Sequence, residues 1–229
     1  MSSRDAILNK LRAAKRPFED APPRPKVYVP VINDFDTSPD ALIERFSAEL
    51  VGLKGDPFVV EGEDAARACV IDRLKQHQAA RILAWHFTHI PVKKLREAIE
   101  AEGIEIIQPD SHDEFRAEIL SAAEGAQVGL TGVENAIAAT GTLIVRTGAG
   151  RGRIPTVLAP VHLAVLSANQ ILPRLENWIA LQRTKGINNL RGSANVCFIS
   201  GPSRTGDIEM ELILGVHGPG RVEVIIKNS

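Results

Sequence analysis

The chain has little cysteine, which limits the metal chemistry expected of it. Its 229 residues include two cysteines, Cys69 and Cys197, which show no CxxC spacing and no neighbouring pair of histidines. An iron–sulfur cluster usually needs about four thiolates, so we expect this chain alone to bind no cofactor of that kind. A disulfide between the two is not expected in a reducing compartment. Cys197, in the apolar run NVCFIS, is predicted to be a small buried residue.

A surplus of charge and a long apolar run are also missing. The chain has 27 basic and 28 acidic side chains, a formal net charge of -1. A duplex-binding protein usually has a basic surplus or stripe, so nucleic acid is not an expected partner. No apolar run approaches the roughly 18 residues that span a bilayer, and residues 1–20 have no apolar core of the signal-peptide type. We therefore expect a cytoplasmic protein without a membrane span.

The composition is that of an ordinary globular protein, with 44% apolar and 24% charged residues. Residues 1–30 differ from the rest, because a short amphipathic helix over residues 4–14 is followed by five prolines that prevent further helix. We divide the chain into this N-terminal helix and proline-rich arm, 1–30, and an α/β domain, 31–229. The arm is either solvated or contacts a neighbouring subunit of a homo-oligomer, and both interpretations stay open.

From residue 38 onward, helical and strand patterns alternate. The expected helices cover 38–50, 63–76, 91–103 and 113–125, and the expected strands cover 57–62, 80–86 and 104–109. Apolar strands that alternate with helices are typical of an α/β fold with a mostly parallel sheet covered on both faces.

The second half of the chain has a different rhythm. ENAIAA (134–139) and TLIVRT (142–147), joined through Thr140 and Gly141, predict a hairpin. Further strands are expected at 159–167, 193–200 and 221–228, and helices at 168–184 and 207–215. These patterns indicate an antiparallel insertion in the α/β domain.

The strongest candidate site is the turn SGPSRTG, which is predicted to join a buried strand to the helix at 207–215. A helix start has unpaired N–H groups and a partial positive charge, so it attracts anions. Open α/β sheets bind ligands beyond the carboxyl ends of their strands. We therefore predict that an anionic small molecule binds at this turn, although simple helix capping is the alternative. The predicted ligand-binding residues here are Ser200, Gly201, Ser203, Arg204 and Thr205.

Two other turns and several ionisable residues are candidates for the same pocket. The glycine-rich run 147–155 lacks the dinucleotide fingerprint, and it is interpreted either as a hairpin tip or as the support of arginines that reach the anion. Two histidines near residue 86 show no third metal ligand, so no metal site is expected. The predicted additional ligand-binding residues are Thr140, Gly141, Thr142, Arg151 and Arg153, and the candidate catalytic residues are Glu134 and His217.

Three motifs carry a family resemblance: GVENAIAATGTLIV (132–145), LAPVHLAVLSANQIL (158–172) and SGPSRTGDIEMELILGVHGPG (200–220). With them, and with the glycine-rich turn that contains Arg153, the chain resembles the lactate utilization protein C (LutC/YkgG) family, the stand-alone LUD-domain proteins. The resemblance implies a NagB/RpiA/CoA transferase-like fold, a three-layer α/β/α sandwich. It also implies a role in oxidising L-lactate to pyruvate with two partner proteins, LutA-like and LutB-like, which carry the iron–sulfur clusters.

The chain departs from the family pattern at Gly206, where alanine is expected, and at Glu134–Asn135, in place of a small residue followed by an acid. Whether the chain is itself an enzyme stays open. One alternative is an independent enzyme of this fold that acts on a phosphate, CoA or folate derivative, with Glu134 or His217 as acid or base. The other alternative is a regulatory or scaffolding module without a pocket.

Overall fold

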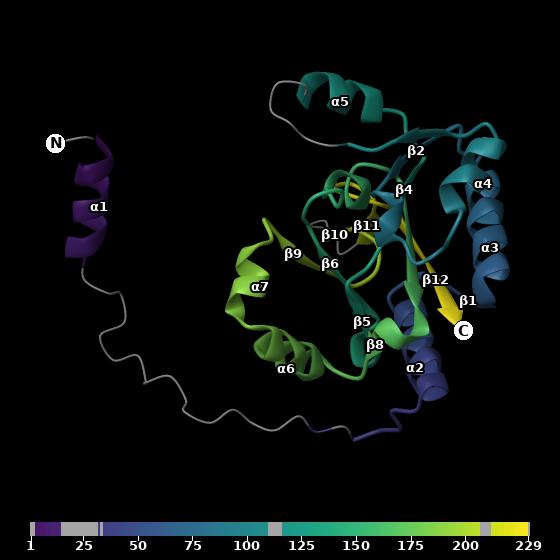
Figure 1. Ribbon diagram of the computed structural model, residues 1–229, viewed down its shortest axis with the longest axis horizontal. Helices are drawn as coiled ribbons and strands as arrows, with labels where there is room; N and C mark the ends of the chain where they lie inside the picture. The colour runs from purple at the N-terminus through teal and green to yellow at the C-terminus, as the bar shows by residue number, and fades with distance from the viewer. Residues whose placement is uncertain (1–2, 15–31, 33, 110–115, 207–211, 229) are drawn as a thin grey trace. The chain divides into compact units, whose positions relative to one another are not determined.

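The computed structural model describes residues 3–14, 32, 34–109, 116–206 and 212–228 (Figure 1). The chain divides into two units, Met1–Pro30 and Val31–Ser229. In the first unit, helix α1 (Ser3–Ala13) buries none of its residues, and its apolar Ile7 and Leu11 are exposed. No helix in the described part of the chain is long and apolar enough to cross a membrane.

The second unit is built on a six-stranded sheet in which all neighbouring strands are parallel, in the order β1-β12-β7-β4-β2-β3. The strands are β1 (Asp56–Glu61), β2 (Arg81–Ala84), β3 (Glu105–Ile107), β4 (Val128–Gly132), β7 (Val161–Ser167) and β12 (Arg221–Asn228). The central strands β4 and β7 are buried along nearly their whole length, as expected where both faces of a parallel sheet are covered. The predicted α/β fold class with a mostly parallel sheet is confirmed.

Four helices pack around this sheet: α2 (Pro39–Gly52), α3 (Gly62–Gln76), α4 (Leu95–Ala101) and α5 (Arg116–Ala123). Helix α2 begins with Pro39 and buries Leu42, Phe46 and Leu50, which recur at the spacing of one helical face. Helices α3 and α4 lie side by side along one flank of the sheet (Figure 1). Helix α4 begins four residues later than predicted, because Lys94 has a left-handed backbone conformation with φ 53°.

A second, four-stranded sheet has the order β8-β5-β6-β9. Its strands are β5 (Asn135–Ile137), β6 (Thr142–Arg146), β8 (Ile171–Leu172) and β9 (Val196–Ile199). Strands β5 and β6 form the predicted hairpin, joined by the 3₁₀ turn η3 (Ala138–Thr140) and Gly141. A Cβ at Gly141 would lie 2.6 Å from the backbone nitrogen of Leu50. Glycine is therefore required there by the close approach of helix α2.

The small sheet lies between the main core and the helices α6 (Leu175–Lys185) and α7 (Ile187–Arg191) (Figure 1). Leu143 and Val145 face the main core, whereas Ile137 and Ile144 pack on Trp178 of α6. The predicted helix over 168–184 is wrong at its start. Residues 168–172 form the 3₁₀ turn η5 (Ala168–Gln170) and strand β8, and the helix begins only after Pro173.

The predicted helix over 207–215 is also wrong where the structure describes it. Residues 207–211 lie outside the described residues, but the segments on both sides are strands, β10 (Arg204–Gly206) and β11 (Leu212–Leu214), paired antiparallel. Ser203 and Gly215 continue this pairing, because the Gly215 N–H donates to the Ser203 carbonyl over 3.0 Å. A short apolar run does not distinguish helix from strand by periodicity alone. The described residues therefore give no helix start at the SGPSRTG turn.

Candidate functional site

The order of the parallel strands marks one place where a ligand site is expected. Strands β2 and β4 are neighbours, but the chain leaves β2 toward β3 at one edge and leaves β4 toward β7 on the other side. Ligands of open α/β sheets bind in the crevice at such a switch point, beyond the carboxyl ends of the strands. The residues that follow the two strands are Trp85 and His86 after β2, and Val133 and Glu134 after β4.

A cavity of about 270 Å³ opens beside this point, and we call it the carboxyl-edge cavity. It is lined by Ala84, His86, Gln108, Pro109, Gly150, Gly152 and Pro155. The glycine-rich turn closes on the strand end through two bonds: the His86 N–H donates to the Gly150 carbonyl over 2.8 Å, and Trp85 Nε1 donates to the Gly152 carbonyl over 2.8 Å. At Gly150, where φ is +68°, a Cβ would lie 2.8 Å from the His86 Cβ. Gly150 and Gly152 thus form one wall of the cavity, since neither has a side chain that would fill it.

Two ionisable side chains next to this wall have shifted pKa values. Burial lowers the pKa of His89, and the charges of Arg151 and His86 lower it further, against a hydrogen bond to the Ala149 backbone that raises it. Burial also lowers the pKa of Arg151, and the charge of Arg146 adds to this, whereas Glu134 opposes it. The lowered pKa favours the neutral form of His89, whereas Arg151 is a cation within the glycine-rich run 147–155.

Glu134, Arg146 and Arg151 form a group that we call the Arg–Glu cluster. Arg146 Nη2 lies 3.4 Å from Glu134 Oε1, and the two side chains are 14% and 10% exposed. Three atoms of the cluster are buried and have no hydrogen-bond partner in the described structure: Glu134 Oε2, Arg146 Nε and Arg151 Nε. Arg146 pairs with the carboxylate, and the charge of the same carboxylate raises the pKa of Arg151, so two guanidinium groups share one counter-charge. A buried charge without a counter-charge is costly, and this cost favours a bound anion.

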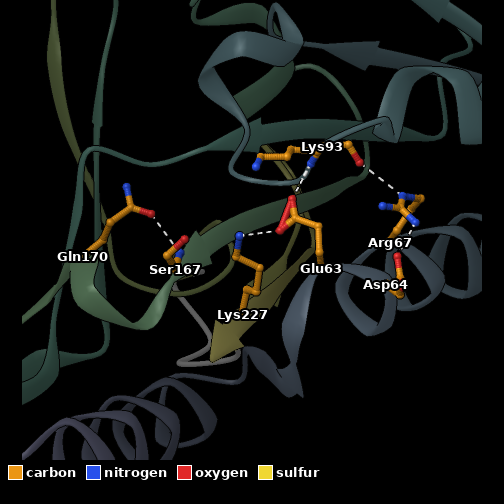
Figure 2. A network of polar contacts seen from close by, with 7 residues as sticks. All are labelled: Glu63, Asp64, Arg67, Lys93, Ser167, Gln170 and Lys227. Carbon is orange, nitrogen blue, oxygen red and sulfur yellow. Dashed lines mark hydrogen bonds and ion pairs between the residues drawn. The ribbon is translucent and has the colours of Figure 1, made fainter. Parts of the chain in front are cut away.

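Two glutamines hold Glu134 in place. Gln182 Nε2 donates to Glu134 Oε1 over 3.4 Å, and the Gln182 amide oxygen in turn accepts from Asn189 Nδ2 over 2.7 Å. Gln170 Nε2 donates to the backbone carbonyls of Val133 (2.8 Å) and Glu134 (3.3 Å). Its own oxygen accepts from the Ser167 N–H at the end of β7 (Figure 2). The end of β4 is therefore tied to the end of β7, and the carboxylate is oriented before any ligand arrives.

A second carboxylate on the same edge has a different environment. Glu63 starts helix α3 next to a cavity of about 290 Å³. Its Oε1 accepts from the Lys93 N–H over 2.5 Å, and its Oε2 pairs with Lys227 Nζ at 2.6 Å (Figure 2). The hydrogen bond from Lys227, followed by that from Lys93, lowers the pKa of Glu63. Both oxygens are occupied, so Glu63 has the contacts of a structural ion pair.

The turn at residues 200–203 lies elsewhere, beside the amino ends of β7 and β12. It lines a cavity of about 230 Å³, which we call the amino-edge cavity, together with His162, Cys197 and Val222. The predicted residues Ser200, Gly201, Ser203 and His217 all line this cavity. Thr142 Oγ1 contacts both Ser200 Oγ and Thr140 Oγ1 at 2.8 Å. The structure thus brings the turns at 140–142 and 200–203 together, as predicted.

It does not bring the predicted arginines to that turn. Arg151 belongs to the Arg–Glu cluster, and the exposed Arg153 contributes its backbone carbonyl to Thr156 Oγ1 at 2.7 Å. Arg204 directs its guanidinium to the Leu53 carbonyl, and Thr205 lies within β10. The expectation that the 200–205 turn lies beyond the carboxyl ends of the parallel strands is also wrong, because the turn follows β9 of the small sheet.

The amino-edge cavity has a neutral floor. His162 is fully buried, its Nε2 lies 2.8 Å from Thr131 Oγ1, and burial lowers its pKa to about 4. Cys197 is half-buried rather than fully buried as predicted, and it packs against the main core as a free thiol. Hydroxyl groups and a neutral imidazole do not balance the charge of an anion, so this cavity suits an uncharged occupant better.

Several residues of the carboxyl edge were not singled out from the sequence. The sequence pattern places Arg146 in an apolar strand and Gln182 in a helix, yet both side chains contact Glu134. The available signal was a charged residue at the end of the otherwise apolar TLIV, which is unusual for a buried strand. In the described residues no group of three or more His, Cys, Asp or Glu side chains is arranged to hold a metal ion.

Comparison with known proteins supports a family assignment. A family model described as "LUD domain" matches residues 43–226. "Lactate utilization protein C" of Halalkalibacterium halodurans is 28% identical over 82% of this chain and 80% of its own length. The protein of the same name from an Exiguobacterium species is 30% identical over 82% and 79%.

A solved structure is also similar. The crystal structure of a DUF162 family protein from Deinococcus radiodurans, at 1.70 Å resolution, has a TM-score of 0.60 and 21% identity and covers 84% of this chain and 99% of its own. At this identity the likeness shows the fold alone. The family model, however, spans most of the α/β unit and includes all three motifs quoted above in full. The chain therefore belongs to the LUD-domain family.

Proposed function

We propose that this protein serves in lactate utilization and that it binds a small carboxylate at the Arg–Glu cluster. The relatives named "Lactate utilization protein C" support the first part. The second part is supported by one observation: beyond the carboxyl end of β4, Arg146 pairs with Glu134, and Arg151 adds a second positive charge that the same carboxylate influences. Lactate and pyruvate are both small carboxylates, so they supply the missing negative charge.

The chemistry of the cluster fits this class of ligand. A guanidinium group donates in a planar fork that matches a carboxylate, and such charge-assisted hydrogen bonds are stronger than neutral ones. Arg146 and Arg151 each have a buried Nε–H without an acceptor in the described structure. Gly150 and Gly152, the chain neighbours of Arg151, line the carboxyl-edge cavity, whose volume of about 270 Å³ is at the small end for ligand pockets. A small metabolite fits this combination.

The proposal moves the anion from the turn at 200–205 to the carboxyl edge. At the former place the Arg204 guanidinium already has an acceptor, the Leu53 carbonyl, and His162 is neutral. We further propose that electrons from lactate pass to iron–sulfur partner proteins of the LutA and LutB kinds. In this scheme the partner proteins accept the electrons, and this chain holds the carboxylate group of lactate. Co-purification of the tagged chain from cells grown on lactate, followed by iron analysis, tests the partnership.

A binding measurement tests the site. Arg151→Gln removes a guanidinium that donates to the ligand, and we expect the dissociation constant for L-lactate to rise by roughly 10- to 100-fold. Isothermal titration of the full chain gives this constant. Arg153→Gln is the matched control, since Arg153 is exposed two residues further along, and it should leave the affinity unchanged. Equal affinities of wild type and Arg151→Gln would refute the site.

Growth tests the role. A strain that lacks the gene should not grow on L-lactate as sole carbon source but should grow on glucose. Growth on lactate should return with the wild-type gene and with Arg153→Gln, and return poorly with Arg151→Gln. Normal growth of the deletion strain on lactate would refute the role in lactate utilization, whatever the binding data show.

A further inference from the structure

We propose that Cys197 is a modification site, at which a small uncharged thiol is attached as a mixed disulfide inside the amino-edge cavity. The proposal goes beyond the carboxylate at the Arg–Glu cluster and does not depend on it, because it concerns the other end of the main sheet. Two features support it: the thiol lines an open cavity between two sheets, and a buried imidazole with an unpaired nitrogen lines the same cavity.

The Cys197 side chain points into the space between the two sheets. Strand β9 pairs with β6 so that Cys197 lies directly opposite Val145. Opposite residues of an antiparallel pair share one face, and Val145 belongs to the main core. On the main sheet, His162 and Val222 are opposite each other in register, and both line the amino-edge cavity together with Cys197. The cavity is thus the open end of the space between the sheets, with the thiol on one wall.

A small molecule can reach this thiol from solvent. Val157 and Phe198, which line the cavity, are 43% and 46% exposed, whereas Val222 is 2% exposed and His162 is fully buried. The cavity therefore has an exposed mouth and a closed floor. Cys197 is half-buried, between these extremes, and it is a free thiol. The volume of about 230 Å³ limits the occupant to a small molecule.

The floor of the cavity is polar where an apolar floor would be enough to close the core. His162 Nε2 lies 2.8 Å from Thr131 Oγ1, but His162 Nδ1 is buried and has no hydrogen-bond partner in the described structure. Such unpaired buried groups are uncommon in proteins, and cavities that stay empty are apolar. The polar floor therefore marks this cavity as a place for an occupant with a polar group, such as a hydroxyl.

The charges around the cavity favour an uncharged occupant. Burial lowers the pKa of His162 to about 4, so the ring on the floor is neutral at neutral pH. Arg204, the cation beside the turn, already directs its guanidinium to the Leu53 carbonyl. His217 is exposed at the mouth, where water screens any charge that it carries. A charged group that enters the cavity loses its hydration and gains no buried counter-charge.

The modification is a thiol–disulfide exchange with a small uncharged disulfide as the co-reactant. The Cys197 thiol loses its proton to solvent, and its thiolate attacks one sulfur of the disulfide. A new S–S bond joins that sulfur to Cys197, the old S–S bond breaks, and the second sulfur leaves as a thiolate with the electron pair of the broken bond. Cys197 is oxidised and the leaving sulfur is reduced. In a reducing compartment such a bond is transient, so the modification is reversible.

The second cysteine of the chain provides an internal comparison. Cys69 lies in α3, and among the described residues it lines neither the carboxyl-edge nor the amino-edge cavity. Burial raises the pKa of its thiol, against the charge of Arg73, which lowers it. Because the thiolate is the nucleophile, Cys69 is expected to react slowly.

The test incubates the full folded chain with 2-hydroxyethyl disulfide, which is small, uncharged and ends in hydroxyl groups. Intact mass followed over time gives the rate, and peptide mapping gives the position. We expect one adduct, at Cys197, that forms at least about tenfold faster than any adduct at Cys69. Cys69→Ser should keep the fast adduct and Cys197→Ser should lack it. Equal rates at the two thiols, or a faster adduct at Cys69, would overturn the proposal, and mapping of the wild type decides this even if a variant does not fold.

Two charged disulfides of similar length test the uncharged class: cystamine, which is cationic, and dithiodiglycolate, which is anionic. Each rate at Cys197 is divided by the rate for the chain unfolded in urea, which removes the intrinsic reactivity of the disulfide. We expect this ratio to be about tenfold higher for the uncharged disulfide than for either charged one. A ratio that is highest for a charged disulfide would overturn the choice of an uncharged thiol. No adduct at Cys197 with any of the three would overturn the site, and neither result bears on the carboxylate at the Arg–Glu cluster.

Discussion

Two cavities of similar volume, about 270 and 230 Å³, lie at the two ends of the same parallel sheet. At the carboxyl edge, a glycine-rich turn leads to Arg151, whose charge adds to that of Arg146 against a single carboxylate. At the amino edge, the cavity is lined by Ser200, Ser203 and His162, and burial keeps His162 neutral. The difference shows that cavity volume does not distinguish the two ends of the sheet as ligand sites. The direction of the strands and the balance of charge at each end distinguish them.

The largest effect is expected from the carboxylate of the Arg–Glu cluster. Glu134→Ala leaves Arg146, whose side chain is 14% exposed, without its paired carboxylate, which should lower the free energy of unfolding by about 3–5 kcal/mol. Glu63→Ala breaks a more exposed pair and should cost about 1 kcal/mol. Urea denaturation of both variants measures the difference. Equal losses would mean that the two carboxylates are equivalent, and the comparison within the carboxyl edge would break down.

The neutral floor of the amino-edge cavity predicts a pH dependence. The pKa of His162 is about 4 in the folded protein, against a usual 6.5. As the pH falls from 6.5 to 4, the unfolded chain takes up a proton that the folded chain does not. The stability contributed by the neutral imidazole is therefore present above pH 6.5 and is lost below it, by about 3 kcal/mol in total.

His162→Gln keeps a polar group for Thr131 but cannot titrate. Urea denaturation at several values between pH 4 and pH 7 should show a steeper loss of stability for wild type than for the variant. Other groups, such as Glu63, titrate in both proteins and cancel in the difference. Parallel curves for the two proteins would show that this cavity is not held neutral by burial.

The glycine-rich turn gives a smaller effect. Gly150→Ala places a Cβ 2.8 Å from the His86 Cβ in a backbone with φ +68°, and should cost about 2 kcal/mol and weaken lactate binding. Gly103→Ala is the control, because φ there is +73° and nothing lies within 4 Å of the new Cβ. It should cost only about 1 kcal/mol. Thermal unfolding and titration with lactate measure both, and unchanged binding by Gly150→Ala would separate the turn from the site.

The smallest effect is expected at the turn that the sequence favoured. Ser200→Ala removes the hydroxyl that contacts Thr142 Oγ1 at 2.8 Å, which should cost about 1 kcal/mol of stability. The affinity for L-lactate should change by less than about twofold, since a neutral hydroxyl at the other end of the sheet is lost. A tenfold loss of affinity would return the anion to the amino-edge cavity and reverse the comparison.

Much of the fold was predictable from local patterns. The apolar runs that became β7 and β12 are buried along most of their length, and the glycine between ENAIAA and TLIVRT marks the hairpin that the structure contains. Helix α2 begins with the predicted proline and buries the predicted face. In each case the signal is a spacing or a backbone requirement within a few residues, which the folded environment does not reverse.

The candidate site was predictable only in part. The pattern assigns the glycine-rich run, its arginines and the turn at 200–205 to one pocket, whereas Gly150 and Gly152 line one cavity and Ser200, Gly201 and Ser203 line another. The helix expected at 207–215 misled the assignment, because its described end, Leu212–Leu214, pairs as a strand with Arg204–Gly206. A short apolar segment follows its tertiary partner rather than its own periodicity.

By itself, the sequence determined the alternation of apolar strands and helices, the hairpin, and the motifs of the LUD-domain family, since all of these depend on residues close together in the chain. Only the tertiary structure decided which charges meet. Glu134, Arg146 and Gln182 come from three separate parts of the chain, and the charges of Arg146 and Glu134 shift the pKa of Arg151 in opposite directions. The physical reason is that the energy of a buried charge depends on every charge near it in space. The strand order brings these residues together, and no local sequence pattern predicts that order.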